Sequence, residues 1–180
     1  MKRVEFSPSG MNLELVEIAN HYELINSTMA NFYLGDSPSF LSRYAFSTPT
    51  QISSEYQGAR KEFEMSVCLT ILASLEAGFR MDYLHRVDRK LKDGLSRAFI
   101  KIYRREKLKV GFETILETWK RHAPSSDVYI RELKGALAYR HWLAHGRYWR
   151  PKLARVHGYT DIYNLAYNIF DGFPFERADT

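Results

Sequence analysis

Cysteine is nearly absent from this chain of 180 residues, which contains Cys68 alone. An intramolecular disulfide is therefore impossible, and a secreted scaffold held together by disulfides is excluded. Cys68 lies within an apolar run. Because free cysteine is commonly buried, we expect an inert thiol in the core.

Long apolar runs are missing as well. The longest, residues 67–75, is much shorter than the about 20 residues that a membrane-spanning helix needs. The charged start of the chain, MKRVEFSPSG, is followed by no apolar stretch, so we expect no secretory signal. These features predict a cytoplasmic protein with no membrane partner.

The alternation of apolar and polar residues that is typical of strands is absent, and no internal repeat is visible. Apolar residues instead recur at spacings of three and four, the period of amphipathic helices. We predict one all-α domain over residues 1–180, built as a bundle of five or six helices. The predicted helices cover residues 11–34, 59–92, 96–109, 111–122, 128–145 and 161–170.

Residues 35–58 show no sustained period and contain six serines, two prolines and two glycines. This composition predicts a long loop or a pair of short elements. Loops of such length in compact domains are often functional, and the aromatic residues of this segment indicate that it packs against something. A lid over a site and a structural wrap are both compatible with the pattern.

Positive charge is concentrated in two blocks. Residues 80–109 hold 11 basic and 4 acidic residues, and residues 120–155 hold 9 basic and 2 acidic ones. The net charge of the whole chain is +5, whereas that of residues 1–79 is −4. Such an asymmetry favours a polyanionic partner, nucleic acid above all, although two solvated helix faces would also account for it.

Polar and aromatic residues crowd the end of the fifth predicted helix, residues 138–149, AYRHWLAHGRYW. At about 100° per residue, His141 and His145 lie about 40° apart and share one face, which Arg140 flanks. Gly146 follows at the position of a left-handed C-cap.

Three interpretations of this cluster compete. Cations at a helix C-terminus offset the helix dipole, but this does not explain the aromatic residues. Two histidines four apart can bind zinc, yet Trp142 occupies the position where hydrolytic zinc helices carry a glutamate. Phosphate chemistry uses the residues best, because histidine can transfer protons near neutral pH and arginine is a permanent cation.

The arrangement resembles the R-x4-H signature of the HEPN superfamily. Arg140, the polar His141 directly after it, and His145 match the signature, and the position late in an all-α chain matches as well. A long central helix precedes them and carries an acidic residue, for which Glu76 is the candidate; Arg80, four residues later, is placed to pair with it.

The resemblance implies a helical bundle of HEPN type and a metal-independent endoribonuclease that needs no cofactor. It implies a homodimer in which the two signature helices line one cleft. By the same analogy His145 acts as general base or acid, Arg140 holds the scissile phosphate, His141 orients or assists, and cleavage leaves a 2′,3′-cyclic phosphate. Glu76 and Arg80 would support the site, or form a plain ion pair.

RNA contacts are expected from residues around the signature: Arg147, Arg150, Tyr148 and Trp142. The aromatic ones could equally pack in the core or a dimer interface. Members of this superfamily act as toxins or in phage defence, so an antitoxin or another defence protein is an expected partner. Arg147 stands where toxin members often have tyrosine. The alternative function is a non-catalytic module that binds nucleic acid, nucleotide or a protein.

Overall fold

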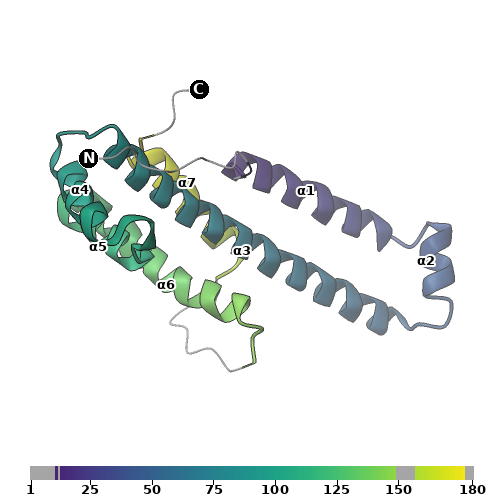
Figure 1. Cartoon of the computed structure of the whole chain (residues 1–180). Coiled ribbons are helices and arrows are strands. Elements are labelled where there is room, and N and C mark those ends of the chain that lie inside the picture. The colour runs from purple at the N-terminus through teal and green to yellow at the C-terminus, as the bar shows by residue number, and fades with distance from the viewer. Residues whose placement is uncertain (1–10, 12, 149–156, 177–180) are drawn as a thin grey trace.

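The computed structural model describes residues 11, 13–148 and 157–176, and within them it confirms the all-α fold. These residues contain seven α-helices, two single-turn 3-10 helices and no strand (Figure 1). None of the helices among them is long and apolar enough to cross a bilayer. The helices are α1 (Leu15–Phe32), α2 (Pro38–Arg43), α3 (Pro49–Asp88), α4 (Gly94–Glu106), α5 (Phe112–His122), α6 (Asp127–Ala144) and α7 (Tyr159–Gly172), with η1 (Lys107–Lys109) and η2 (Pro124–Ser126).

Of the two structures predicted for residues 35–58, the long loop is wrong, because most of this segment is helical. The pair of short elements is nearer, since the segment holds the short helix α2 and the first turns of the long helix α3. Each of its two prolines occupies a first helical turn, behind a capping hydroxyl. Ser37 accepts the N–H of Phe40 at 3.1 Å to begin α2, and Thr48 accepts the N–H of Gln51 at 3.3 Å to begin α3. Proline there loses no hydrogen bond, so it starts a helix rather than breaking one.

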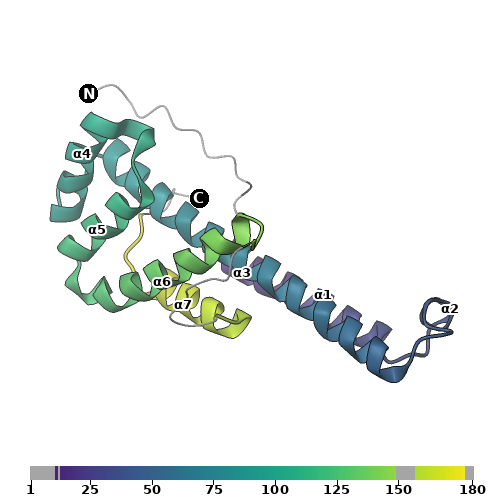
Figure 2. The ribbon, with the colours of Figure 1, turned by 90° about the horizontal axis from the view of Figure 1, so that it is seen from below.

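Helix α2 wraps the tip of an arm formed by α1 and the first half of α3 (Figure 2). Phe40 of α2 and Tyr44, the C-cap of α2, are buried there among aromatic rings, and the Tyr44 hydroxyl donates to Glu55 of α3 at 2.7 Å. From Pro49, where α3 begins, to Glu76 the helix rises about 40 Å. The segment is therefore a structural wrap at the arm tip and does not cover the Glu76 region.

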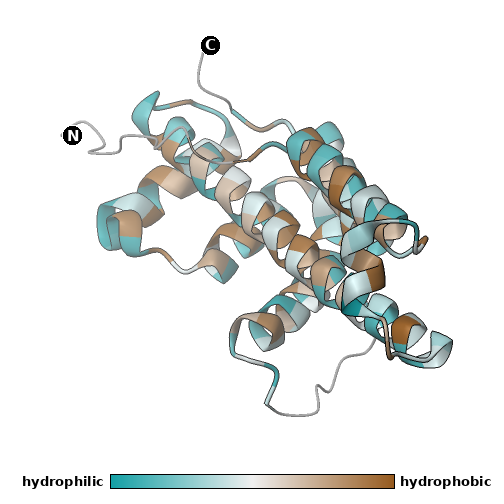
Figure 3. Ribbon diagram, turned by 90° about the vertical axis from the view of Figure 1, so that its right-hand side faces the viewer, coloured by the Kyte–Doolittle hydropathy of each residue, from teal (hydrophilic) through white to brown (hydrophobic). Residues whose placement is uncertain are grey.

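The core surrounds α3 from Val67 to Val87, and all eleven buried residues of this helix lie in that span. Helices α4, α5, α6 and α7 pack against α3. Figure 3 shows hydrophobic and hydrophilic bands alternating along the helices, as amphipathic packing requires. Cys68 is completely buried, as predicted, and burial raises the pKa of its thiol to about 12.

Gly78 of α3 lies against the ring of Phe170 from α7. Helix α3 runs through this residue without interruption, and a Cβ atom placed on it would lie 2.8 Å from Cε1 of Phe170. The glycine therefore allows the Phe170 ring to pack directly on the backbone of the central helix.

A buried ion pair anchors the segment that follows α7. Arg86 and Asp82 of α3 meet at 2.7 Å, with side chains 6% and 0% exposed. Arg86 also donates to the carbonyl of Pro174 at 2.5 Å, and Asp82 accepts the N–H of Glu176 at 2.8 Å. Burial raises the pKa of Asp82 to about 6, although these partners favour its charged form.

Candidate active site at the end of helix α6

One carboxylate of the central helix holds two arginines. Glu76 meets the guanidinium of Arg80 at 2.8 Å and that of Arg140, from α6, at 3.1 Å. The Glu76 side chain is 19% exposed, whereas each arginine side chain is 36% exposed. The carboxylate is thus largely shielded from water, while both cations keep part of their surface open to a ligand.

Arg80 is held further by the chain that follows η1. Its Nη1 donates to the carbonyl of Val110 at 3.2 Å, and its guanidinium lies 5.7 Å from the centre of the Phe112 ring. Because Arg80 is fixed on both sides, Glu76 is a preorganised acceptor for Arg140.

The two histidines lie together, which confirms that they share a face. The ring centres of His141 and His145 are 4.2 Å apart, and both residues are exposed. His145 is the C-cap of α6, and its N–H donates to the carbonyl of His141 at 3.1 Å. A pair of imidazoles at this distance can hand a proton to one ligand and accept one from it.

A Schellman motif ends α6 and confirms the role predicted for Gly146. This glycine has φ +79°, and the next N–H, that of Arg147, donates to the carbonyl of Trp142 at 3.2 Å. The motif ends α6 at Ala144 and leaves His145, the C-cap, exposed at the end of the helix.

The predicted RNA contacts have different environments. Arg147 pairs with Glu62 of α3 at 2.8 Å, which lowers the pKa of Glu62, while Tyr148 is 84% exposed. Trp142 is half-buried and stacks on Tyr139 with ring centres 5.9 Å apart. This environment agrees with the alternative that Trp142 packs against the core and does not contact RNA. Arg150 lies outside the described residues.

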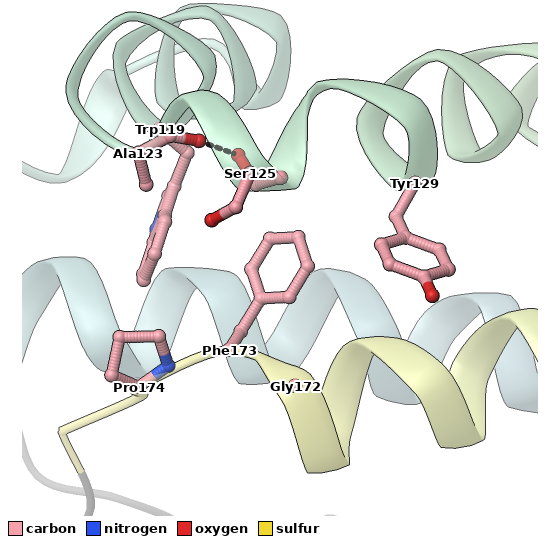
Figure 4. A pocket seen from close by; sticks show the side chains of 8 residues that line it. Trp119, Ala123, Ser125, Tyr129, Gly172, Phe173 and Pro174 are labelled. Carbon is pink, nitrogen blue, oxygen red and sulfur yellow. Dashed lines mark hydrogen bonds between the residues drawn. The ribbon is translucent and has the colours of Figure 1, made fainter.

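A small cavity that sequence reasoning missed lies away from this cluster, between the start of α6 and the end of α7 (Figure 4). Its volume is about 180 Å³, and its walls include Trp119, Ser125, Tyr129 and Phe173. No sequence motif marks it, because its walls come from four separate elements, α5, η2, α6 and α7. It contains none of the residues of the arginine and histidine cluster.

Within residues 11, 13–148 and 157–176, no group of three or more His, Cys, Asp or Glu side chains is placed to hold a metal ion. The chain was also compared with protein-family models, with curated proteins and with solved structures, and it matches none of them. The functional interpretation therefore depends on the geometry of the cluster itself.

Proposed function

We propose that this chain is a metal-independent endoribonuclease of HEPN type. The observation that supports this most is the 3.1 Å ion pair between Glu76 and Arg140. The resemblance named an acidic residue on the central helix, an arginine and a histidine as one site. Glu76 and Arg140 are in contact although 64 positions separate them in the sequence.

The chemistry we propose is attack of a ribose 2′-hydroxyl on the adjacent phosphorus. His145 removes the hydroxyl proton as the 2′-oxygen bonds to phosphorus, and the bond to the 5′-oxygen breaks. Protonated His141, with its ring centre 4.2 Å from that of His145, donates a proton to the departing 5′-oxygen. Arg140 stabilises the charge on the phosphorane, and the products carry a 2′,3′-cyclic phosphate and a 5′-hydroxyl.

Glu76 acts in this scheme as a positioning residue. It orients the Arg140 guanidinium before RNA arrives, and the exposed part of that side chain can then meet a phosphate. Tyr148, 84% exposed directly beyond the helix end, stacks on an unpaired base in this scheme.

A homodimer is part of the proposal, because both histidines are exposed on the surface of one chain. A second copy placed over the end of α6 would turn this open surface into a cleft that excludes water and strengthens electrostatic catalysis. A toxin or phage-defence role, with an antitoxin or other defence protein as partner, belongs to the same proposal.

The test is incubation of the purified protein with total tRNA and with a structured RNA in the presence of EDTA. We expect wild type to cut RNA and leave cyclic phosphate ends, and Arg140→Ala and His145→Ala each to lose about 10²-fold or more in rate. Arg131→Ala is the matched control for arginine, since Arg131 also lies on α6 and also forms an ion pair, at 3.2 Å to Asp127. His122→Ala, on α5, is the control for histidine.

Both control variants should retain the wild-type rate. RNA that stays intact with folded wild type, both with EDTA and with added divalent metal, would refute the nuclease. That outcome would favour a non-catalytic module that binds nucleic acid, nucleotide or a protein partner.

A further inference from the structure

Helix α4 and the following turn η1 carry a row of exposed cations, which we call the α4 stripe. Its members are all exposed. The opposite face of α4 packs into the core through Leu95, Phe99 and Ile102, which are buried. The α4 stripe consists of Arg97, Lys101, Arg104, Arg105, Lys107 and Lys109.

Ion pairs distinguish the α4 stripe from several other basic residues of the two blocks. In the second block Lys120 pairs with Asp127 at 3.0 Å, and Lys134 pairs with Glu113 at 2.7 Å and with Glu117. In the described part of the chain, no member of the α4 stripe forms an ion pair with an acidic side chain. The stripe therefore keeps its positive charge available for a partner.

Helix stability alone does not explain the stripe. Like charges four residues apart, as at Arg97, Lys101 and Arg105, destabilise a helix. Cations of the last turn offset the helix dipole, which accounts for Arg104 and Arg105. Arg97 and Lys101 lie further from that end, where the benefit has faded.

The end of the stripe is attached to the candidate active site through the backbone. The carbonyl of Lys107 accepts the Tyr83 hydroxyl at 3.0 Å, and the carbonyl of Val110 accepts Arg80 at 3.2 Å. Arg80 shares the Glu76 carboxylate with Arg140. Backbone contacts and the shared Glu76 carboxylate therefore connect the end of the stripe to the arginine of the signature.

We propose that the α4 stripe binds the phosphate backbone of an RNA strand and leads it toward Arg140. Successive members such as Arg97 and Lys101 are about 6 Å apart along the helix, so they form one row that can follow one strand. The exposed positions carry no aromatic residue, so the contact is to phosphates and independent of base sequence. The apolar face of α4 is buried in the core and cannot insert into a lipid surface.

This inference rests on the proposed function only in taking RNA as the ligand. Binding is tested in the full-length His145→Ala background, so that the probe is not cut. The probe is a fluorescein-labelled oligouridylate of about 20 nucleotides, and anisotropy is measured between about 50 and 200 mM salt. The stripe variant is Arg97→Gln, Lys101→Gln and Arg105→Gln together. The control carries Lys120→Gln, Arg131→Gln and Lys134→Gln, which remove the same charge from ion-paired positions.

We expect the stripe variant to flatten the dependence of log affinity on log salt by about 2, since each lost phosphate contact on a single strand contributes about 0.7. The control should keep the slope of its parent. The inference would be overturned if all three proteins had equal slopes, or if both triple variants lost the same amount of slope. It would also be overturned if the parent bound phosphatidylserine vesicles and not RNA. Circular dichroism of both triple variants verifies that they are folded.

The cleavage assay separates this inference from the proposed function. Wild type that fails to cut RNA, together with a stripe variant that loses binding, refutes the nuclease and supports the α4 stripe. Wild type that cuts RNA, together with a stripe variant that binds and cuts like the control, supports the nuclease and refutes the α4 stripe.

Discussion

Two glycines of helix α3 should respond differently to alanine. At Gly78 a Cβ atom would lie 2.8 Å from the Phe170 ring, whereas at Gly58 it would meet no atom within 4 Å. Both positions lie in the interior of the same helix, so they share the backbone effect and differ in packing. The pair isolates the cost of crowding α7 against α3.

The magnitudes follow from these distances. Alanine is about 1 kcal/mol more favourable than glycine inside a helix, and Gly58→Ala should stabilise the fold by about that amount. At Gly78 the same gain is offset by overpacking, which costs about 1–3 kcal/mol when neighbouring groups must move. We therefore expect Gly78→Ala to be less stable than Gly58→Ala by about 1–3 kcal/mol.

Thermal unfolding followed by circular dichroism measures this difference, because 1 kcal/mol corresponds to about 2–4 °C in a chain of this size. Gly58→Ala should unfold a few degrees above wild type, and Gly78→Ala several degrees below Gly58→Ala. Adding Phe170→Leu should weaken the penalty at Gly78 in a double-mutant cycle. Equal melting temperatures for the two alanine variants would refute the packing of Phe170 on Gly78.

Three further predictions concern charge and reactivity. Glu76→Gln keeps the shape of the side chain but removes the charge that orients Arg140, so the cleavage rate should fall about tenfold, about 1.4 kcal/mol, with the fold retained; an unchanged rate would refute the positioning role. Arg86→Met should lower the free energy of unfolding by about 3–5 kcal/mol at pH 8, because Asp82 is left buried without its cation. That loss should shrink toward pH 5. The pKa of Asp82 in the folded protein is already about 6, and removing the Arg86 cation raises it further. Below that pKa the folded state binds a proton that the unfolded chain, with a pKa of about 3.9 for Asp, does not yet bind, so the folded state is stabilised as the pH falls. A deficit that does not change between urea titrations at these two pH values would contradict this. Cys68, completely buried with a pKa of about 12, should not react with a disulfide reagent at pH 8 until denaturant is added, and fast labelling of the native protein would show that the core opens there.

The segment 35–58 shows which local signals matter more than composition. Its serines and prolines suggest a loop, yet Ser37-Pro38 and Thr48-Pro49 are helix starts that can be read from sequence. The hydrophobic period is weak at the start of α3 because, of its residues 49–58, only Ile52 and Tyr56 are partly buried and the others are exposed. A helix buried on one narrow side needs few apolar residues.

Some features of the candidate site could likewise be predicted from nearby residues, and others could not. The shared face of His141 and His145 depends on residues four positions apart, and the helical period predicted it. The left-handed Gly146 directly after the C-cap was predicted from the residue type. The partner of Arg147 could not be predicted, because Glu62 lies 85 positions earlier and meets it only when α6 packs on α3.

By itself the sequence determined the all-α class, the approximate helix ranges and the chemistry available at the end of α6, because these depend on residue types and on a repeat of 3.6 residues. The tertiary structure alone decided that Glu76 holds Arg140, and that the cations of α6 are neutralised while those of α4 are not. The physical reason is the short range of ion pairs, which form only between side chains that the packing of distant helices brings within a few ångströms.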